Sequence, residues 1–379
     1  MQPHKAERAD GDRDLREPVR DHSLTCFSRT RTTLIQTRST VKRSRLALAV
    51  FLVFAPAASP QRPSPRADAK PLVLTGVIPL PNVQGRIDHL GSDFKGRLFI
   101  SALGNNSEEV LDLAAGIRAH SISGIPKPQG VTYSPEANKL FVGSDEGKLY
   151  IYDGAFLDLI TALDFGDDVD NLRYDAASKR VYVGYGDGEE GAIAIVDTTT
   201  NQRLPEEFKL GAHPESFQLE KSGTNIYVNL PDLKETAVID RNTGKISRWP
   251  LTLESNFPMA LDEANHRLFV VTHAPPRLAV FATDTGRVIA VLPCVQNADD
   301  VFFDARHQRI YVPGGEGYIS VFQRNGADHY ELLAKVPSAL GARTGGYSGK
   351  GTKGFEVVYV AVPARADHGA EVLLYTVQD

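Results

Sequence analysis

The chain has 379 residues, of which 42% are hydrophobic by type and 23% are charged, and its formal net charge is −5. That apolar fraction is sufficient for a large hydrophobic core and excludes an intrinsically disordered chain. Only 2 Cys exclude a disulfide-stabilised scaffold, and 32 Gly, 23 Pro, 13 Tyr and 17 Phe favour short strands and tight turns over long helices.

The first part of the chain differs from the rest in charge. Residues 1–60 carry 11 Lys and Arg against 6 Asp and Glu, which leaves 31 basic and 41 acidic residues, a net charge of −10, in 61–379. A basic stretch at 42–45 precedes an apolar run at 46–55, and small residues follow this run. This order is the pattern of a secretory signal peptide.

The ten residues of the apolar run are too few to span a bilayer, which needs about 20. An uncleaved N-terminal anchor or a buried helix is the other interpretation. We predict a disordered leader and signal peptide at 1–60 and a linker at 61–70. The protein is then exported, either periplasmic or extracellular, with no membrane span in the mature chain. Val41, read as an alternative start, would give the signal peptide an ordinary length.

One phrase recurs after residue 70. It consists of an apolar pair, an acidic or Ser-Pro turn, a basic residue and an aliphatic-aromatic-aliphatic triplet, and it is clearest at 131–143, 172–184, 259–271 and 301–313. Its central aromatic residues are 41 to 48 positions apart: Phe99, Phe141, Tyr182, Tyr227, Phe269, Tyr311 and Tyr359. Repeats with a period of about 20 to 50 residues indicate propellers or similar arrays.

Each repeat contains four strand-like stretches, which in the sixth repeat are 300–303, 309–312, 318–322 and 330–336. Four short antiparallel strands repeated radially describe a propeller blade. We therefore predict an all-β fold, a seven-bladed β-propeller over 71–379. The stretch 72–80 resembles a fourth strand, whereas the last repeat ends with a third-type strand at 371–377. The N-terminal strand should therefore complete the last blade and leave no free sheet edge.

The phrases Arg-Val-Tyr-Val-Gly at 180–184 and Arg-Ile-Tyr-Val at 309–312 carry a family resemblance. At this period and behind a signal peptide, the repeat resembles the YVTN-repeat (YncE-like) family of bacterial seven-bladed propellers, over about residues 70–379. The resemblance implies export and a binding role. WD repeats would end in Trp-Asp, and kelch repeats would show a recurrent double glycine. Dehydrogenases that use pyrroloquinoline quinone (PQQ) place a tryptophan in many blades, and Trp249 is the only one here, so PQQ is not expected.

Polar residues gather where the chain enters each blade. In a propeller the first strands line the channel, and the loops that enter them share one face with the loops between the second and third strands. The entry loops supply Arg86, Asp88, His89, Gln129, Asp167, Asp168, Asp170, Asn171, His213, Glu215, Ser216, Asn256, Asn297, Asp299, Asp300 and Arg343. The second set of loops adds Asn105, Asn106, Tyr185, Asp187, Asn229, His273 and Glu316.

Convergent titratable groups of this kind mark a candidate site. The predicted ligand-binding residues are Asp88, His89, Gln129, Asp170, Asn171, His213, Glu215, Asp299, Asp300 and Arg343. The other interpretation is that they are ordinary polar loops around a water-filled channel.

Two function classes fit this ring of residues. The leading hypothesis is a non-catalytic, monomeric binding protein that engages a small polar ligand, an ion or a protein partner. The alternative is a lactonase-like hydrolase, by analogy of fold alone, with His89 or His213 as general base beside Glu215 or Asp300, and with Arg343 stabilising an oxyanion. Histidines with carboxylates could also hold a divalent metal, although no local metal-ligand motif is present.

Three further features of the sequence bear on possible functions. The net charge of −10 on 61–379 argues against nucleic-acid binding, and no clear basic patch is present beyond Lys350 and Lys353. The glycine-rich stretch 345–354 does not match the spacing of a phosphate-binding loop, and we expect an irregular loop there instead of a regular hairpin. Cys294 lies in the apolar stretch 291–295, which favours a buried structural thiol over a reactive nucleophile.

Overall fold

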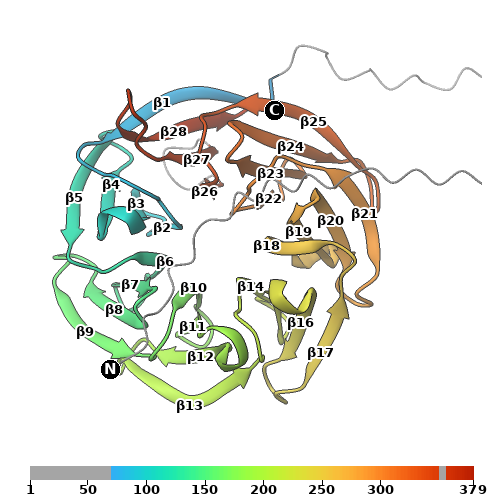
Figure 1. The fold of residues 1–379 in the computed structure, drawn as a ribbon, viewed down its shortest axis with the longest axis horizontal. Coiled ribbons are helices and arrows are strands. Elements are labelled where there is room, and N and C mark those ends of the chain that lie inside the picture. The colour runs from blue at the N-terminus through green and yellow to red at the C-terminus, as the bar shows by residue number, and fades with distance from the viewer. Residues whose placement is uncertain (1–69, 350–355) are drawn as a thin grey trace, which may run out of the picture. The chain divides into compact units, whose positions relative to one another are not determined.

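The computed structural model describes residues 70–349 and 356–379. The predicted leader, signal peptide and linker up to residue 69 lie outside the described residues, as do Lys350 and Lys353. The described part forms seven four-stranded antiparallel sheets arranged as a ring (Figure 1). The prediction of an all-β seven-bladed propeller is therefore confirmed. Within the described ranges, no helix is long and apolar enough to cross a membrane.

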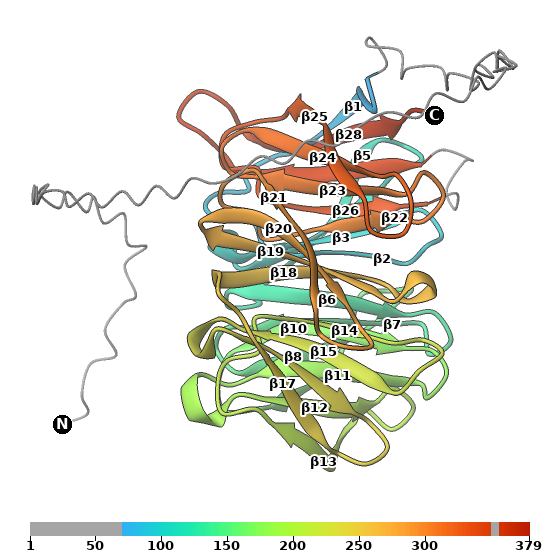
Figure 2. The ribbon, with the colours of Figure 1, turned by 90° about the vertical axis from the view of Figure 1, so that its right-hand side faces the viewer.

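The strands of each blade pair in chain order from the channel outward. The first three blades are β2 (Leu90–Ser92), β3 (Arg97–Ala102), β4 (Ser107–Asp112) and β5 (Ile117–Ser123); β6 (Pro128–Ser134), β7 (Lys139–Ser144), β8 (Lys148–Asp153) and β9 (Leu159–Asp164); and β10 (Val169–Asp175), β11 (Arg180–Tyr185), β12 (Ala192–Asp197) and β13 (Gln202–Lys209). In Figure 2 the inner strands β6 and β18 (Glu254–Asp262) run along the axis of the ring.

The fourth to sixth blades repeat this arrangement. They are β14 (Ser216–Leu219), β15 (Asn225–Leu230), β16 (Glu235–Asp240) and β17 (Ile246–Pro250); β18, β19 (Arg267–Ala274), β20 (Pro276–Ala282) and β21 (Val288–Pro293); and β22 (Phe302–Asp304), β23 (Arg309–Gly314), β24 (Tyr318–Arg324) and β25 (Tyr330–Pro337). The four strands of the sixth blade begin and end within two residues of the predicted bounds.

The last blade joins the two ends of the propeller. It contains β26 (Thr344–Ser348), β27 (Val357–Val362), β28 (Ala370–Val377) and, as its outermost strand, β1 (Leu72–Leu80). The pairing of β1 with β28 is antiparallel and runs from Leu72 opposite Val377 to Leu80 opposite Ala370. The predicted closure by the N-terminal strand is confirmed.

The core consists of seven hydrophobic clusters of described residues, each between two neighbouring blades. Each cluster contains one of the seven central aromatic side chains, and all seven are buried. Phe99 faces the second blade, whereas its neighbours Leu98 and Ile100 face the last blade. Because successive side chains of a strand point to opposite faces, the aliphatic-aromatic-aliphatic triplet supplies both faces of each blade.

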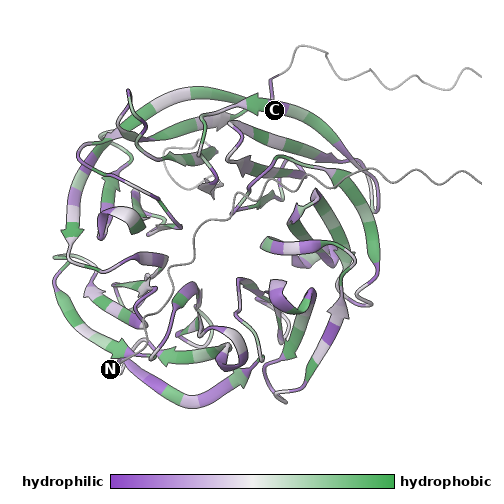
Figure 3. Cartoon of the chain, viewed as in Figure 1, coloured by the Kyte–Doolittle hydropathy of each residue, from purple (hydrophilic) through white to green (hydrophobic). Residues whose placement is uncertain are grey.

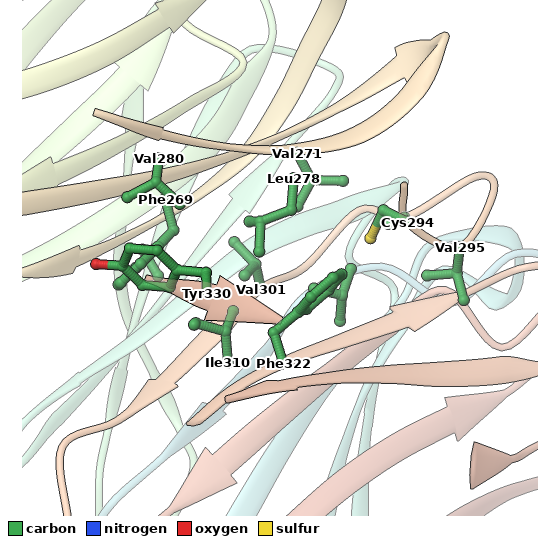
Figure 4. Close-up of a cluster of buried hydrophobic side chains, with 13 residues drawn as sticks. Phe269, Val271, Leu278, Val280, Cys294, Val295, Val301, Ile310, Phe322 and Tyr330 are labelled. Atoms are coloured by element: carbon green, nitrogen blue, oxygen red, sulfur yellow. The ribbon is translucent and has the colours of Figure 1, made fainter. Parts of the chain in front are cut away.

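The cluster between the fifth and sixth blades illustrates this packing (Figure 4). The rings of Phe269 and Tyr330 meet edge to face with centroids 5.9 Å apart, an arrangement that aromatic pairs prefer. Cys294 lies in the same cluster and is 7% exposed, so the predicted buried thiol is confirmed. By contrast, hydrophobic and hydrophilic segments alternate along outermost strands such as β5 and β13, where one face meets solvent (Figure 3).

The turn in the repeated phrase has a local cause. Its Asp or Ser side chain accepts a backbone N–H two or three residues later, at 3.0 to 3.3 Å, in four repeats: Ser134, Asp175, Asp262 and Asp304. The residue before the basic position then has a positive φ in the same four repeats: Asn138, Lys179, His266 and Gln308. Such side-chain turns fix the reversal from the first to the second strand.

One prediction is wrong in part. Residues 345–348, expected as the start of an irregular loop, belong to β26 and pair with β27 in regular antiparallel register from Thr344 to Ser348. Only a glycine fits at position 345, because a Cβ there would lie 2.4 Å from the carbonyl oxygen of Tyr359. Gly345 thus allows β26 to lie close to β27. Residues 350–354 lie outside the described residues.

The closure strand provides a test of the fold. Ile78 is 1% exposed and packs in the cluster between the last and first blades, so Ile78→Ala should lower the free energy of unfolding by about 3 kcal/mol. Its neighbour Val77 is 44% exposed, and Val77→Thr should change this free energy by less than about 0.5 kcal/mol. Urea unfolding followed by fluorescence measures both, and equal effects would contradict the assigned register of β1.

Candidate functional site

The predicted residues meet at one end of the channel, and we call this group the channel mouth: Arg86, Asp88, His89, Gln129, Asp168, Asp170, Asn171, Asp187, His213, Glu215, Asp299, Asp300 and Arg343. Backbone hydrogen bonds fix the entry loops, since Asp88 N–H donates to the Ser101 carbonyl and Glu215 N–H donates to that of Asn229. Gly130 on β6 allows β10 to approach, because a Cβ there would lie 1.8 Å from the carbonyl oxygen of Asp170.

Alternating acids and imidazoles cross the mouth, and we call these five residues the ionic chain. Asp300 Oδ1 lies 3.5 Å from His89 Nδ1, and His89 Nε2 lies 3.8 Å from Asp170 Oδ1. Asp170 Oδ2 lies 3.6 Å from His213 Nε2, and His213 Nδ1 lies 3.7 Å from Asp187 Oδ1. The chain therefore joins the entries of the sixth, first, third and fourth blades.

Both imidazoles favour their charged form. Burial disfavours the charge of His89, but the hydrogen bond and charge of Asp300, with Asp88 and Asp170, outweigh burial and raise its pKa to about 10. Burial also disfavours the charge of His213, but the hydrogen bond and the charge of Asp170 outweigh burial and raise the pKa of His213 to about 10. Burial alone would raise the pKa of Asp170, but the two imidazoles reverse this and lower it.

The acids beside the ionic chain respond in the opposite direction. Burial, followed by the charge of Asp170, raises the pKa of Glu215 to about 8 and that of Asp168 to about 8. Burial also raises the pKa of Asp88, although Arg86 opposes it with a nitrogen 3.1 Å from Asp88 Oδ2. At neutral pH the raised pKa values thus favour the protonated forms of His89, His213, Glu215 and Asp168, whereas the lowered pKa of Asp170 favours its ionised form.

Amide side chains connect these groups. Asn171 Nδ2 donates to Asp170 Oδ2 at 3.0 Å and to the Glu215 carbonyl at 2.7 Å, so it links the third and fourth blades. Gln129 Nε2 donates to Asp168 Oδ1 at 3.0 Å, and its buried Oε1 has no hydrogen-bond partner among the described residues.

A second ion pair borders the mouth. Arg343 Nε lies 2.7 Å from Asp299 Oδ2, and its terminal nitrogen donates to Asn297 at 3.2 Å. His273, from the loops between the second and third strands, lies 4.0 Å from Asp299 and hydrogen-bonds the Ala298 carbonyl at 2.8 Å. Burial lowers the pKa of His273, which therefore differs from His89 and His213.

A cavity of about 190 Å³ adjoins the ionic chain inside the channel. Its wall includes His89, Asn171, Arg173, Gln218, Met259 and Phe302. Sites for drug-sized ligands measure about 300 to 1,000 Å³, so this cavity suits a smaller molecule.

Sequence reasoning missed Arg173 and Gln218, because it stopped where each first strand begins. One signal was available in the repeat phrase. The second residue of the apolar pair is Thr132, Ala260 or Phe302 in other clear copies, and Arg173 is the only charged residue among these four.

The described residues contain two groups of three side chains that could hold a metal, each with ligand atoms within 4.8 Å of one another. Asp168, Asp187 and His213 form the first, inside the mouth, and offer the nitrogen and oxygen donors that zinc accepts. The second contains Asp304, His307 and Glu356, which lie away from the mouth, beside the turn after β22. His307 Nδ1 there lies 2.7 Å from Asp304 Oδ2, a hydrogen bond within the turn.

Comparisons with known proteins identify the fold. The sequence matches no protein-family model and no curated protein. A chain in a crystal structure of the mitotic checkpoint complex is similar with a TM-score of 0.70 and 13% identity, over 88% of this chain and 99% of that chain. A chain of Kuenenia stuttgartiensis hydrazine synthase has a TM-score of 0.62 and 16% identity, over 74% and 94%. The WD40 repeats of RRP9 have a TM-score of 0.67 and 12% identity, over 81% and 100%. At such identities the similarity describes the propeller fold alone.

The imidazoles of the ionic chain predict how stability depends on pH. Their pKa is about 6.5 in an unfolded chain, and it is about 10 in the folded protein. The folded state therefore binds more protons between these values. Their stabilisation is complete below about pH 6.5 and is lost as the pH rises toward 10, by up to about 1.4 kcal/mol per pH unit for each imidazole. Glu215 and Asp168, with raised pKa values, change stability in the same direction up to about pH 8.

Urea unfolding from about pH 7 to about pH 9 measures this dependence. The double variant His89→Gln, His213→Gln should show a shallower fall in the free energy of unfolding than the wild type. His329→Gln, which changes an exposed histidine on the outside of the sixth blade, should keep the wild-type slope. A double variant with the wild-type slope would mean that the ionic chain is not protonated as described.

Cys294 should react only after unfolding. Burial raises the pKa of its thiol to about 12, so the thiolate is scarce near neutral pH and the reagent has little access. Iodoacetamide at about pH 8 should leave the peptide containing Cys294 unmodified in the native protein and should alkylate it in urea. Mass spectrometry measures the alkylation of that peptide in both conditions. Rapid alkylation of the native protein would contradict the buried position of Cys294.

Proposed function

We propose that this propeller is a binding protein whose channel mouth engages a small polar ligand, without catalysis. The observation that carries the proposal is the ionic chain, which lies directly beside the cavity of about 190 Å³. Removing charges from water is costly unless they are paired, and four entry loops contribute to pairing them. A channel with only a structural role needs no such groups. The site is also preorganised, because its ionisable side chains hold one another in place.

The geometry does not favour the hydrolase alternative. A general base must be unprotonated, yet the imidazoles of His89 and His213 have pKa values of about 10. Arg343, the candidate for oxyanion stabilisation, is paired with Asp299 at 2.7 Å. The hydroxyl of Ser216 donates to the Phe257 carbonyl and does not face an imidazole.

The finer assignments are also proposals. The phrases at 180–184 and 309–312 support membership of the YVTN-repeat (YncE-like) family, together with the number of blades. The basic and apolar pattern at 42–55 supports export to the periplasm or the extracellular space. We propose a monomer that does not bind nucleic acid, in keeping with the net charge of −10 on 61–379.

A thermal-shift screen tests the binding function. Its compounds are small carboxylates, amino acids, neutral sugars, and the chlorides of magnesium, calcium and zinc. A ligand at 100 times its Kd stabilises the folded state by about 2.7 kcal/mol, so we expect at least one compound to raise the Tm of the wild type measurably. Asp170→Asn should abolish that rise, because it removes the charge between the two imidazoles.

Asp158→Asn is the matched control, since Asp158 is exposed in the turn between β8 and β9, and this variant should respond like the wild type. The proposal is wrong if no compound raises the Tm. It is also wrong if every responding compound stabilises Asp170→Asn as strongly as the wild type.

A further inference from the structure

Arg173 stands out among the residues of the channel. It lies on β10 and lines the cavity of about 190 Å³. One terminal nitrogen donates to the Leu172 carbonyl at 2.8 Å, and the guanidinium carbon lies 5.4 Å from the centroid of the Phe217 ring. Within the described ranges Arg173 forms no ion pair with a carboxylate, and Asp300 and Asp170 act on it only through their more distant charges. An arginine remains charged in any protein environment, so the cavity contains a fixed cation.

Two other enclosed arginines among the described residues are paired with carboxylates. Arg241, with a side chain 13% exposed, lies 3.3 Å from Asp175, and Arg324, 8% exposed, lies 3.2 Å from Asp262. Each of these carries a carboxylate partner across a blade interface. For Arg173, burial outweighs the more distant charges of Asp300 and Asp170 and lowers its pKa. Its charge is thus left without a close counter-ion.

The two nearest acids are engaged elsewhere. Asp300 accepts the Gly345 N–H at 2.8 Å and faces His89 at 3.5 Å. Asp170 faces both imidazoles and accepts from Asn171 at 3.0 Å. Neither can turn toward Arg173 without breaking the ionic chain. An anion bound in the cavity would give Arg173 the close counter-charge that these two acids do not supply.

The rest of the cavity wall indicates what else the ligand contains. Part of it is apolar and includes Leu90, Val131, Met259 and Phe302. Such side chains favour hydrocarbon, so a ligand with an apolar part matches this wall better than inorganic phosphate or sulfate does. The volume corresponds to about six water molecules at about 30 Å³ each, which is close to the six non-hydrogen atoms of a four-carbon acid.

We propose that the channel cavity binds a small organic monocarboxylate, with its carboxylate on Arg173 and its hydrocarbon part against Met259 and the neighbouring apolar wall. This inference rests on the proposed binding function and names its ligand class. The planar guanidinium matches a carboxylate with two parallel hydrogen bonds. The nearby acids Asp170 and Asp300 disfavour a multiply charged anion, which selects for a single negative charge.

Isothermal titration calorimetry on the full chain tests the ligand class with four probes: butyrate, acetate, inorganic phosphate and the neutral isostere butyramide. Butyrate should bind, acetate should bind more weakly because it contacts less of the apolar wall, and butyramide should bind at least about 10-fold more weakly than butyrate. Butyramide binding as tight as butyrate overturns the proposal. Phosphate binding tighter than butyrate also overturns it and identifies an inorganic anion site.

Variants assign the contact to Arg173. Arg173→Met should weaken butyrate binding at least about 10-fold, and Arg173→Lys should retain part of the affinity as a point charge without the planar fork. Arg173→Met should also leave the Tm of the ligand-free protein unchanged or higher, because it removes an unpaired buried charge. Arg287→Gln, an exposed control in the turn between β20 and β21, should alter neither measurement.

The outcomes separate this inference from the proposed function. Wild-type affinity for butyrate in Arg173→Met overturns the assignment, and a large fall in the Tm of the ligand-free variant assigns Arg173 a structural role instead. If Arg173→Met does not fold, Arg173→Lys and the comparison of butyrate with butyramide still decide. If butyrate fails to bind while a sugar or a metal ion gives a shift that depends on Asp170, the monocarboxylate is excluded and the binding function stands.

Discussion

The contact between blades is the interaction on which the rest of the structure depends. The second strand of each blade places one aromatic side chain against the next blade and two aliphatic side chains against the previous blade. A blade alone would expose two apolar faces, so it is stable only between two neighbours, and only a closed ring gives every blade two neighbours. Once the blades pack in this way, their first strands converge on the axis, and the channel with its entry loops follows.

Much of the fold could be predicted because its causes are local and repeated. The aliphatic-aromatic-aliphatic triplet has the two-residue period of a strand buried on both faces, and the preceding Asp or Ser forms the turn through its own side chain. Closure could be predicted from counting strand types. The inner strand at 344–348 could not be predicted, because its two glycines give no hydrophobic pattern and its register is defined by backbone pairing with β27.

The position of the site was predictable, but its chemistry was not. Counting back from the aromatic residues places polar groups at one end of the channel, and the structure brings them together there. Which acid faces which base depends on residues far apart in the chain, such as His89 with Asp170 and Asp300. Protonation depends on burial, which the sequence does not show, so the charged forms of His89 and His213 could not be predicted. Arg173 was missed because it lies two residues beyond Asn171 along β10, inside the first strand of its blade.

The closure strand also has a consequence in time. Thr75 of β1 hydrogen-bonds the carbonyl of Leu374, a residue 299 positions later, so the last blade cannot form until nearly the whole propeller has left the ribosome. Contacts of such long sequence separation are slow to form. Until then β1, which is synthesised first, has no partner strand, and an unpaired strand edge is a template for aggregation. The chain is therefore exposed to aggregation in the interval between the synthesis of β1 and closure, and a chaperone that covers β1 would act within it.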